Sequence, residues 1–374
     1  MTSIINKQLR FNVIPNKARE TKEETISSEK TKKTEVGPES DLDKKIPNLN
    51  DIQKKIKNIK IFENFELINY VDSGSESYVY KIQNKKTKKD YILKIIKNHN
   101  NKRRNLNELR ITSKLKHQNL IDFNGYFLSK KGDDNNEYII MENAKYGNLR
   151  NFLLNTLKIK RSLSESMICF LSYQILEGLN YCHRSKIAHM DIKAQNIVVD
   201  DYLNTKLIDF SISIDYKNKK PNDTIKLSLE GTPFYISSEV YNSDVIEYKD
   251  INKVDSYALG VLLFNLAFGC YPYNLKSGDE KNITKIKEKI KGKLEIKSSS
   301  NFSSYFIDFV SKLLENDITK RMSIYEAIQH PWIKGAKFLN DEKEKMYNLS
   351  SFITKLLTDS IYQFNDYLKT NDIK

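Results

Sequence analysis

The octapeptide HMDIKAQN and the triplet DFS, which follows it after IVVDDYLNTKLI, contain the residues best suited to chemistry in this sequence. Asp191 could accept a proton from an attacking hydroxyl, and Lys193 could neutralise charge on a moving anionic group. The amide oxygen of Asn196 and the carboxylate of Asp209 are hard ligands of the kind that magnesium prefers. Together these groups could transfer a phosphoryl group, whereas the structural alternative is a polar turn between two strands.

Both motifs closely resemble the catalytic loop and the metal-binding triplet of the eukaryotic protein kinases. The resemblance implies that Asp191 is the catalytic base and that Lys193 acts on the transferred phosphate of ATP. It also implies that Asn196 and Asp209 hold Mg²⁺. Lys193 is typical of the serine/threonine branch of that family, so protein hydroxyls are the expected acceptors.

The nucleotide-binding residues that the resemblance implies lie earlier in the chain. YILK places Lys94 where the family has its phosphate-binding lysine, with Lys97 as the alternative, and NLNELRITSKL offers Glu108 as the ion-pair partner. YIIMENAKYGNL resembles the strand and hinge that hold adenine through backbone hydrogen bonds. The nucleotide-binding residues expected are Gly74, Val79, Lys94, Glu108, Met141, Glu142 and Ala144.

Three later segments resemble structural parts of the family's larger lobe, namely GTPFYISSE, VDSYALG and NDITKRMSIYEAIQHPWI. The resemblance implies an ion pair between Glu239 and Arg321, and it places Thr232 near the base and its lysine. It also implies that Asp255 braces the backbone around His189. The structural or regulatory residues expected are His189, Phe210, Thr232, Glu239, Asp255 and Arg321.

The nucleotide loop departs from the family pattern. It reads VDSGSESYV, so Gly74 is the glycine of G-x-G-x-x-G that remains, with Asp72 and Ser77 at the other two positions. Glycine allows backbone amides to approach phosphates closely, so we expect weakened nucleotide binding. DFS carries Ser211 where the family has glycine. These departures favour an alternative function, that of a pseudokinase acting as a binding or scaffold module.

The catalytic loop also lacks the arginine that most of the family has before the catalytic aspartate, because Met190 occupies that position. In relatives this arginine binds a phosphate on the activation loop through charge-assisted hydrogen bonds. We therefore expect loop phosphorylation, for which Thr224 and Ser228 are candidate sites, to matter little, although Lys206 or Lys226 could receive a phosphate. Since the charged catalytic residues are complete, an active enzyme is the first hypothesis.

The motifs need a small sheet followed by a larger helical part. Alternating apolar residues in FELINYV, SYVYKIQN and YILKIIK predict antiparallel strands, EYIIMEN predicts a further strand, and NLNELRITSKL predicts a helix among them. SESMICFLSYQILEGLNYCH and VDSYALGVLLFNLAFG predict long buried helices. The expected fold is α+β, a two-lobed protein-kinase-like fold with a small antiparallel-sheet N-lobe that holds one main helix and a larger, mainly helical C-lobe.

The kinase-like domain is expected to span residues 62–333. The chain from Thr21 to about Asn58 is rich in Lys, Glu, Ser, Thr and Asn and has little to bury, so residues 1–61 are predicted to be a disordered extension. Residues 334–374 are predicted to form a C-terminal helical tail, because apolar residues between 346 and 368 follow one helical stripe. That stripe could pack on the larger lobe or bind a regulatory partner.

The formal net charge of +14 would ordinarily suggest a nucleic-acid or membrane partner. Arginine is scarce while lysine and asparagine are abundant and evenly spread, so we interpret the charge as a compositional bias and expect no specific nucleic-acid partner. Three cysteines without CxxC spacing indicate neither disulfides nor zinc, and no apolar run is long enough to span a membrane. We expect an intracellular protein, cytoplasmic or nuclear, that acts on protein substrates.

Overall fold

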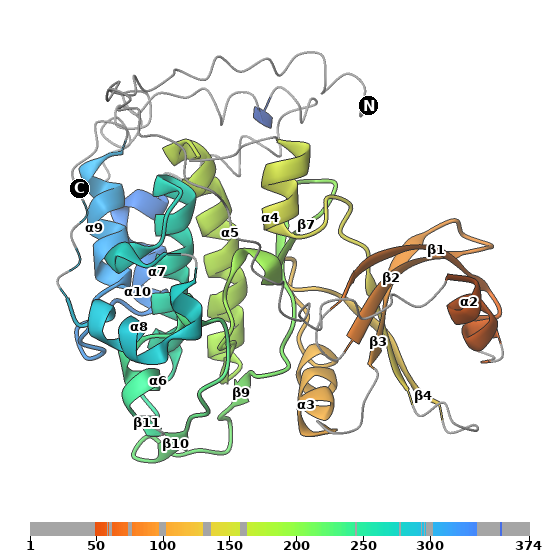
Figure 1. The fold of residues 1–374 in the computed structure, drawn as a ribbon, viewed down its shortest axis with the longest axis horizontal. Coiled ribbons are helices and arrows are strands. Elements are labelled where there is room, and N and C mark those ends of the chain that lie inside the picture. The colour runs from red at the N-terminus through yellow and green to blue at the C-terminus, as the bar shows by residue number, and fades with distance from the viewer. Residues whose placement is uncertain are drawn as a thin grey trace, which may run out of the picture. The chain divides into compact units, whose positions relative to one another are not determined.

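The computed structural model describes much of the chain, and Figure 1 draws these residues in colour. The described residues are 49–57, 59, 62–73, 77–96, 102–129, 136–157, 163–243, 245–276, 278–292, 294, 296, 302–334 and 352–353. The chain divides into two compact units, residues 1–63 and residues 64–374.

Helix α2 (Leu49–Lys57) belongs to the first unit, and for these residues it corrects the prediction that residues 1–61 are disordered. Leu49, Ile52 and Ile56 recur at helical spacing and so lie along one side of the helix. Sequence reasoning missed this helix because charged and polar residues outnumber a short apolar stripe. Residues 1–48 lie outside the described part of the chain.

The small lobe of the second unit is built on a five-stranded antiparallel sheet of order β1-β2-β3-β5-β4. Its strands are β1 (Phe65–Ser73), β2 (Ser77–Asn84), β3 (Asp90–Ile96), β4 (Phe123–Leu128) and β5 (Glu137–Glu142). Successive side chains of a strand point to opposite faces, which accounts for the alternation in the sequence. Asn84 sets the turn after β2, because its side-chain oxygen accepts hydrogen bonds from the N–H groups of Lys86 and Thr87.

Helix α3 (Lys102–Thr112) follows β3 and lies beside the sheet (Figure 1). The apolar pattern placed this helix at 105–115, so the observed helix begins and ends earlier. Leu115 is buried beyond the end of α3. Its apolar character therefore reflects burial in the core rather than continuation of the helix.

The larger lobe is mainly helical (Figure 1). Its α-helical and π-helical segments are α4 (Leu149–Asn151), the π-helix η3 (Phe152–Thr156), α5 (Glu165–Arg184), α6 (Ser238–Asn242), α7 (Asn252–Phe268), α8 (Ile283–Ile290), α9 (Ser304–Leu313) and α10 (Ile324–Gln329). Its 3-10 turns are η4 (Ala194–Asn196), η5 (Pro233–Tyr235), η6 (Pro272–Asn274) and η7 (Asp279–Lys281). Among the described residues, no helix has both the length and the apolar character needed to cross a membrane.

Short pairs of strands adjoin several loops of the larger lobe. The pairs are β6 (Ile187–Ala188) with β9 (Ile214–Asp215), β7 (Ile197–Val199) with β8 (Thr205–Leu207), and β10 (Thr224–Lys226) with β11 (Val245–Glu247). The β6–β9 and β7–β8 pairs flank HMDIKAQN and DFS. They therefore bring the two motifs, which are separate in the sequence, close together.

Helices α5 and α7 form the centre of the core of the larger lobe. Ser164 caps the start of α5 by accepting a hydrogen bond from the N–H of Met167. Helix α7 packs so closely at Gly260 that an added Cβ would lie 2.9 Å from Leu314 Cγ. This tight packing gives α7 a fixed position from which Asp255 can act on the catalytic loop.

Two apolar residues of the stripe region at 346–368, Phe352 and Ile353, are described, and both are buried in the core of the larger lobe. The ring of Phe352 packs edge-on against Phe170 of α5, with 5.3 Å between the ring centroids. Ile353 beside it is 5% exposed. The other residues of the stripe at 346–368 lie outside the described part. For these two residues the contact favours packing on the lobe over a partner-binding role.

Replacing Phe352 with alanine is expected to lower the free energy of unfolding by about 3 kcal/mol, because the change leaves a cavity beside Phe170. Thermal unfolding of the purified protein would then show a melting temperature lower by several degrees. Tyr325→Ala truncates an aromatic side chain that is 69% exposed, so it is the matched control and should change little. An unchanged melting temperature for Phe352→Ala would show that the tail does not support the core.

Candidate active site

The loop HMDIKAQN is anchored to the buried helix α7 through Asp255. The Asp255 carboxylate accepts hydrogen bonds from the backbone N–H groups of His189 and Met190, each at 2.8 Å, and lies 2.8 Å from His183 Nε2. Burial acts to raise the pKa of Asp255, but the hydrogen bond from His183 and the contacts of His189 outweigh it, and the pKa lies below its ordinary value. A buried, ionised carboxylate therefore fixes the backbone of the catalytic loop.

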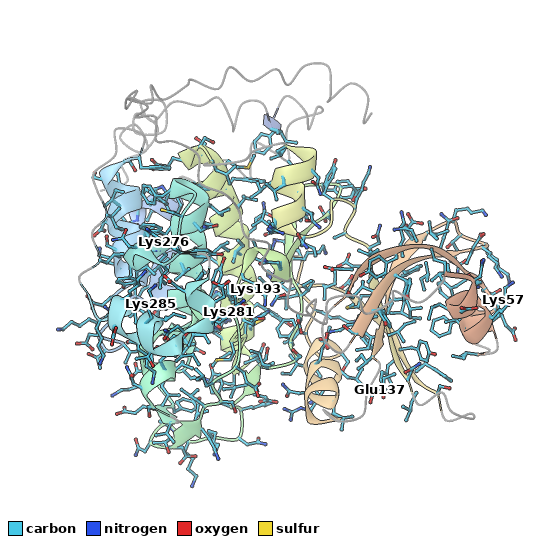
Figure 2. The ribbon with its side chains drawn as sticks, viewed as in Figure 1. Lys57, Glu137, Lys193, Lys276, Lys281 and Lys285 are labelled. Atoms are coloured by element: carbon cyan, nitrogen blue, oxygen red, sulfur yellow. The ribbon has the colours of Figure 1, made fainter. Side chains whose placement is uncertain are left out.

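Asp191 lies at the centre of a compact polar cluster. Its Oδ2 accepts hydrogen bonds from Lys193 Nζ and Asn196 Nδ2, each at 2.7 Å. Its Oδ1 accepts one from Thr232 Oγ1 at 3.2 Å. Lys193 Nζ, labelled in Figure 2, also donates to Thr232 Oγ1 at 2.8 Å. The structure thus joins residues from HMDIKAQN with a residue of GTPFYISSE.

Two residues of the site hold left-handed backbone conformations that non-glycine residues rarely adopt. The angle φ is 72° at Met190 and 66° at Asp209. Each such conformation costs on the order of 1–3 kcal/mol and persists where surrounding contacts enforce it. At Met190 the enforcing contact is the hydrogen bond to Asp255. Backbone strain of this kind concentrates at functional sites.

Lys94 of β3 and Glu108 of α3 form a closely spaced ion pair. Lys94 Nζ lies 2.7 Å from both carboxylate oxygens of Glu108 and 4.0 Å from Asp209 Oδ1. Burial raises the pKa of Glu108 against the opposing charge of Lys94. Burial also acts to raise the pKa of Asp209, but Lys94 and the hydrogen bonds from Ser211 lower it overall. Lys94 therefore stands between the carboxylates of two lobes.

The side-chain amide of Asn196 has a defined orientation. Its Nδ2 donates to the backbone oxygen of Asp191 at 2.9 Å and to Asp191 Oδ2 at 2.7 Å. The acceptor atom Oδ1 takes no part in these two hydrogen bonds and points away from Asp191. The backbone oxygen of Asn196 accepts a hydrogen bond from the N–H of Ile208 at 2.9 Å, so Asn196 lies next to the residue that precedes Asp209. An amide oxygen and a nearby carboxylate fit a hard cation such as Mg²⁺.

Val79 and Met141, which were expected to bind the nucleotide, share one face of the sheet with Lys94. Val79 lies opposite Lys94 across β2 and β3, and Met141 lies opposite Ile92 across β3 and β5. Directly opposite residues share a face, and so do residues two apart on one strand. Val79, Ile92 and Met141 therefore lie on the same face as Lys94.

Glu142 and Ala144 lie where the sheet ends and the chain enters the larger lobe. Ala144 packs with Ile121 and Val198 in a small buried cluster. The Glu142 carboxylate pairs with Lys206 Nζ at 2.9 Å. Lys206 thus already has a carboxylate partner, and the expectation that it could receive a phosphate on the activation loop stays a prediction.

Phe210 packs directly against the catalytic loop. Its ring centroid lies 4.8 Å from that of His189, and the His189 Nε2 atom lies 3.1 Å from the backbone oxygen of Ile208. Phe210 is 1% exposed. These contacts couple DFS to HMDIKAQN. Gly74 of the nucleotide loop and Lys97, the alternative to Lys94, lie outside the described residues. Their roles in nucleotide binding therefore stay predictions.

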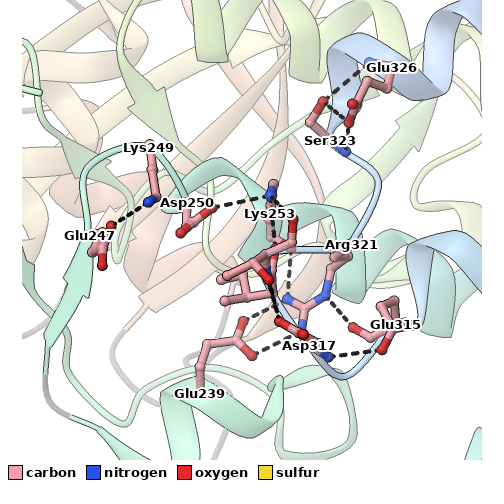
Figure 3. A network of polar contacts seen from close by, with 12 residues as sticks. Glu239, Glu247, Lys249, Asp250, Lys253, Glu315, Asp317, Arg321, Ser323 and Glu326 are labelled. Carbon is pink, nitrogen blue, oxygen red and sulfur yellow. Dashed lines mark hydrogen bonds and ion pairs between the residues drawn. The ribbon is translucent and has the colours of Figure 1, made fainter.

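Glu239 and Arg321 form an ion pair within the larger lobe (Figure 3). Arg321 Nη1 lies 2.6 Å from Glu239 Oε1, and Nη2 lies 3.0 Å from Oε2. Arg321 also donates to the backbone oxygens of Glu315 at 2.7 Å and Lys253 at 3.1 Å. Its guanidinium carbon lies 5.1 Å from the ring centroid of Tyr257. The pair links Glu239, at the end of the activation segment, to the helical core.

Three residues close to the site were missed by sequence reasoning. Ile92 stands where the family motif V-A-I-K has alanine, and its place two residues before Lys94 could have marked it. Val198 packs with Ala144 from a different strand, a contact that no local pattern indicates. Asn107, next to Glu108 on α3, hydrogen-bonds to the segment after Asp209.

Comparison with known proteins identifies the class to which this chain belongs. Residues 65–333 match a family model described as the protein kinase domain. The Aurora kinase of Dictyostelium discoideum is 29% identical over 279 residues, which cover 73% of this chain and 66% of that protein. Myosin light chain kinase family member 4 of Mus musculus is 29% identical over 289 residues, covering 76% and 70%. Probable serine/threonine-protein kinase mkcD of Dictyostelium discoideum is 28% identical over 290 residues, covering 75% and 42%.

The two-lobed fold, with an antiparallel sheet before a helical lobe, defines a kinase-like protein, as the sequence predicted. The family match covers most of the residues in both lobes. The chain belongs to the eukaryotic protein kinase family. It spans 66% of the Aurora kinase and 42% of mkcD, so the activities of those whole proteins extend to it only as proposals.

Proposed function

We propose that this chain is an active serine/threonine protein kinase, which transfers the γ-phosphate of ATP to protein hydroxyls with the help of Mg²⁺. The observation that carries the proposal is the assembly of all the charged groups at one site. Lys94 lies 2.7 Å from Glu108 and 4.0 Å from Asp209, and Lys193 lies 2.7 Å from Asp191. A binding module needs no such arrangement.

Each of these groups has a distinct role in the proposed reaction. Asp191 orients the acceptor hydroxyl and accepts its proton, while Lys193 neutralises charge on the transferred phosphate. Lys94, held by Glu108, binds the phosphates of the nucleotide. Bound Mg²⁺ supplies further neutralisation of the phosphate charge, and Asn196 Oδ1 and the Asp209 carboxylate would hold it.

Thr232 supports the serine/threonine branch. Its hydroxyl contacts both Asp191 Oδ1 at 3.2 Å and Lys193 Nζ at 2.8 Å, the position that a threonine takes in that branch. The mkcD relative is also described as a probable serine/threonine-protein kinase. The acceptors proposed are therefore serine and threonine side chains of protein substrates.

A pseudokinase that works as a binding or scaffold module is the second candidate. Ile92 favours it, because a branched side chain stands on the face of Lys94 where the family has alanine. Ser211 and the altered loop around Gly74 also favour a pseudokinase. All three features bear on nucleotide affinity, whereas none removes a catalytic charge, so we place activity first.

A phosphate-transfer assay with radiolabelled ATP and a generic protein substrate separates the two candidates. Wild-type protein is expected to transfer label, and Asp191→Asn is expected to lower the rate about a hundredfold or more, because the amide cannot accept the hydroxyl proton. Asp201→Asn makes the same charge change at an exposed turn and is the matched control. Absence of transfer by wild-type protein that binds ATP would favour the pseudokinase.

A further inference from the structure

Asn107 connects α3 to the segment that follows Asp209. Its Nδ2 lies 3.3 Å from the backbone oxygen of Phe210, 3.3 Å from that of Ser211 and 2.7 Å from that of Ser213. The residues joined are more than 100 positions apart in the sequence. One side chain of the small lobe thus binds three backbone oxygens within residues 210–213, which belong to the other half of the site.

The orientation of the Asn107 amide follows from its surroundings. Three carbonyl oxygens face Nδ2, so the flipped amide would place its own oxygen against them. On the other side, Arg110 Nη2 lies 3.4 Å from Asn107 Oδ1, which places a cation next to the amide oxygen. Donor and acceptor ends of the amide are therefore both satisfied.

Arg110 adds an ion pair to the same junction. Its Nη2 lies 3.4 Å from Asp215 Oδ2 of β9. A cavity of about 460 Å³ lies beside this pair, and its lining includes Arg110, Met190, Asp215, Lys226 and Glu230. The lining contains both signs of charge, and Met190 contributes an apolar side chain at the position of the family's phosphate-binding arginine. Asp215 thus supplies a carboxylate partner for Arg110 without any added phosphate.

We infer that Asn107 is a positioning residue, which sets α3 so that Glu108 meets Lys94 and does so without phosphorylation of the activation segment. Glu108 follows Asn107 directly in one helix, so a tether at Asn107 limits both the rotation and the sliding of Glu108. The inference rests on the proposed kinase function. It assigns to Asn107, with support from Arg110, the ordering role that an activating phosphate would otherwise perform.

The test uses Asn107→Asp in the full-length chain, with Asn69→Asp on the exposed part of β1 as the matched control. Aspartate keeps the shape of asparagine but directs a carboxylate at three carbonyl oxygens, so α3 should detach from the segment after Asp209. We expect kcat to fall at least tenfold in Asn107→Asp, with melting temperature preserved, and to stay within twofold of wild type in Asn69→Asp. Equal kcat in the two variants would overturn the inference.

Hydrogen–deuterium exchange gives a second readout that does not depend on catalysis. Exchange in α3 and in residues 210–213 is expected to rise at least tenfold in Asn107→Asp and to stay unchanged in Asn69→Asp. If wild-type protein transfers no phosphate, the proposed function fails, yet the exchange measurement still decides whether Asn107 holds α3. Unchanged exchange in Asn107→Asp would overturn the tether itself.

Phosphatase treatment tests the independence from phosphate. Dephosphorylated wild-type protein is expected to keep kcat within about threefold of the untreated protein. Asn107→Asp should be equally slow before and after treatment. A loss of a hundredfold or more on dephosphorylation of the wild type, reproduced by Thr224→Ala or Ser228→Ala, would show that a phosphate positions α3 and would overturn the inference.

Discussion

Replacing Lys94 with methionine or Asp209 with asparagine is expected to slow phosphate transfer on the order of a hundredfold to a thousandfold while the protein stays folded. Lys94 Nζ lies 2.7 Å from Glu108 and 4.0 Å from Asp209 Oδ1, so each change removes one charge from a series that alternates in sign. Methionine retains much of the length of lysine, and asparagine retains the shape of aspartate. Both variants therefore lose electrostatic contact with the nucleotide or the metal and keep their packing.

Glu108 explains why the Lys94 variant should fold. Burial already raises the pKa of this carboxyl, so it can take up a proton once Lys94 is absent. The small lobe then avoids an uncompensated buried charge. The loss expected in Lys94→Met is accordingly a loss of rate rather than of structure.

Initial rates of radiolabel transfer, measured beside circular dichroism and thermal unfolding, check this prediction. Lys114→Met and Asp201→Asn make the same charge changes at exposed positions and serve as controls. Near-normal turnover in folded Lys94→Met or Asp209→Asn would show that the site has been assigned wrongly. A similar loss in a control would attribute the effect to net charge instead.

Replacing Arg321 with leucine is expected to lower the free energy of unfolding by about 3–5 kcal/mol. The Arg321 side chain is 0% exposed and Glu239 is 15% exposed, so the change leaves a largely buried carboxylate without its partner. The backbone oxygens of Glu315 and Lys253 lose a donor as well. Leucine cannot offset these losses, because the pocket that holds the guanidinium is lined by acceptors.

The midpoint of urea unfolding, followed by tryptophan fluorescence, measures this effect, since Trp332 is buried in the same lobe. Lys320→Leu is the matched control, because Lys320 pairs with Asp317 at 3.2 Å but is 74% exposed, and it should shift the free energy by less than about 1 kcal/mol. If the two variants unfolded at the same urea concentration, the Glu239–Arg321 pair would contribute no more than a surface contact.

Much of the fold could be predicted because its pattern is local. Period-two alternation identified β1, β2 and β3, the apolar run in EYIIMEN identified β5, and long apolar patterns identified α5 and α7. Strand β4 was not predicted, because FNGYFL contains Asn124 and Gly125 and lacks alternation. The two- and three-residue strands of the larger lobe depend on pairing between distant segments, so no local signal marks them. The π-helical segment at Phe152–Thr156 was likewise not predicted.

The candidate site was predicted to the extent that its residues belong to motifs. Asp191, Lys193 and Asn196 are close in the sequence, and the structure places their side chains in mutual contact. Contacts between motifs were harder to predict. Asn107 reaches backbone oxygens that any residue could provide, so no partner side chain in the sequence points to it.

The anchoring of the catalytic loop by Asp255 bears on the reaction cycle that we propose for this protein. Asp191, Lys193, Thr232 and Asp255 all belong to the larger lobe, whereas Lys94 and Glu108 belong to the sheet lobe and α3. In the reaction that we propose, the lobes would separate to release the spent nucleotide, and the groups that handle the acceptor hydroxyl would keep their mutual geometry. Only the nucleotide half must re-form on closing, so the opening and closing of the lobes can set the pace of turnover without any cost of rebuilding the base.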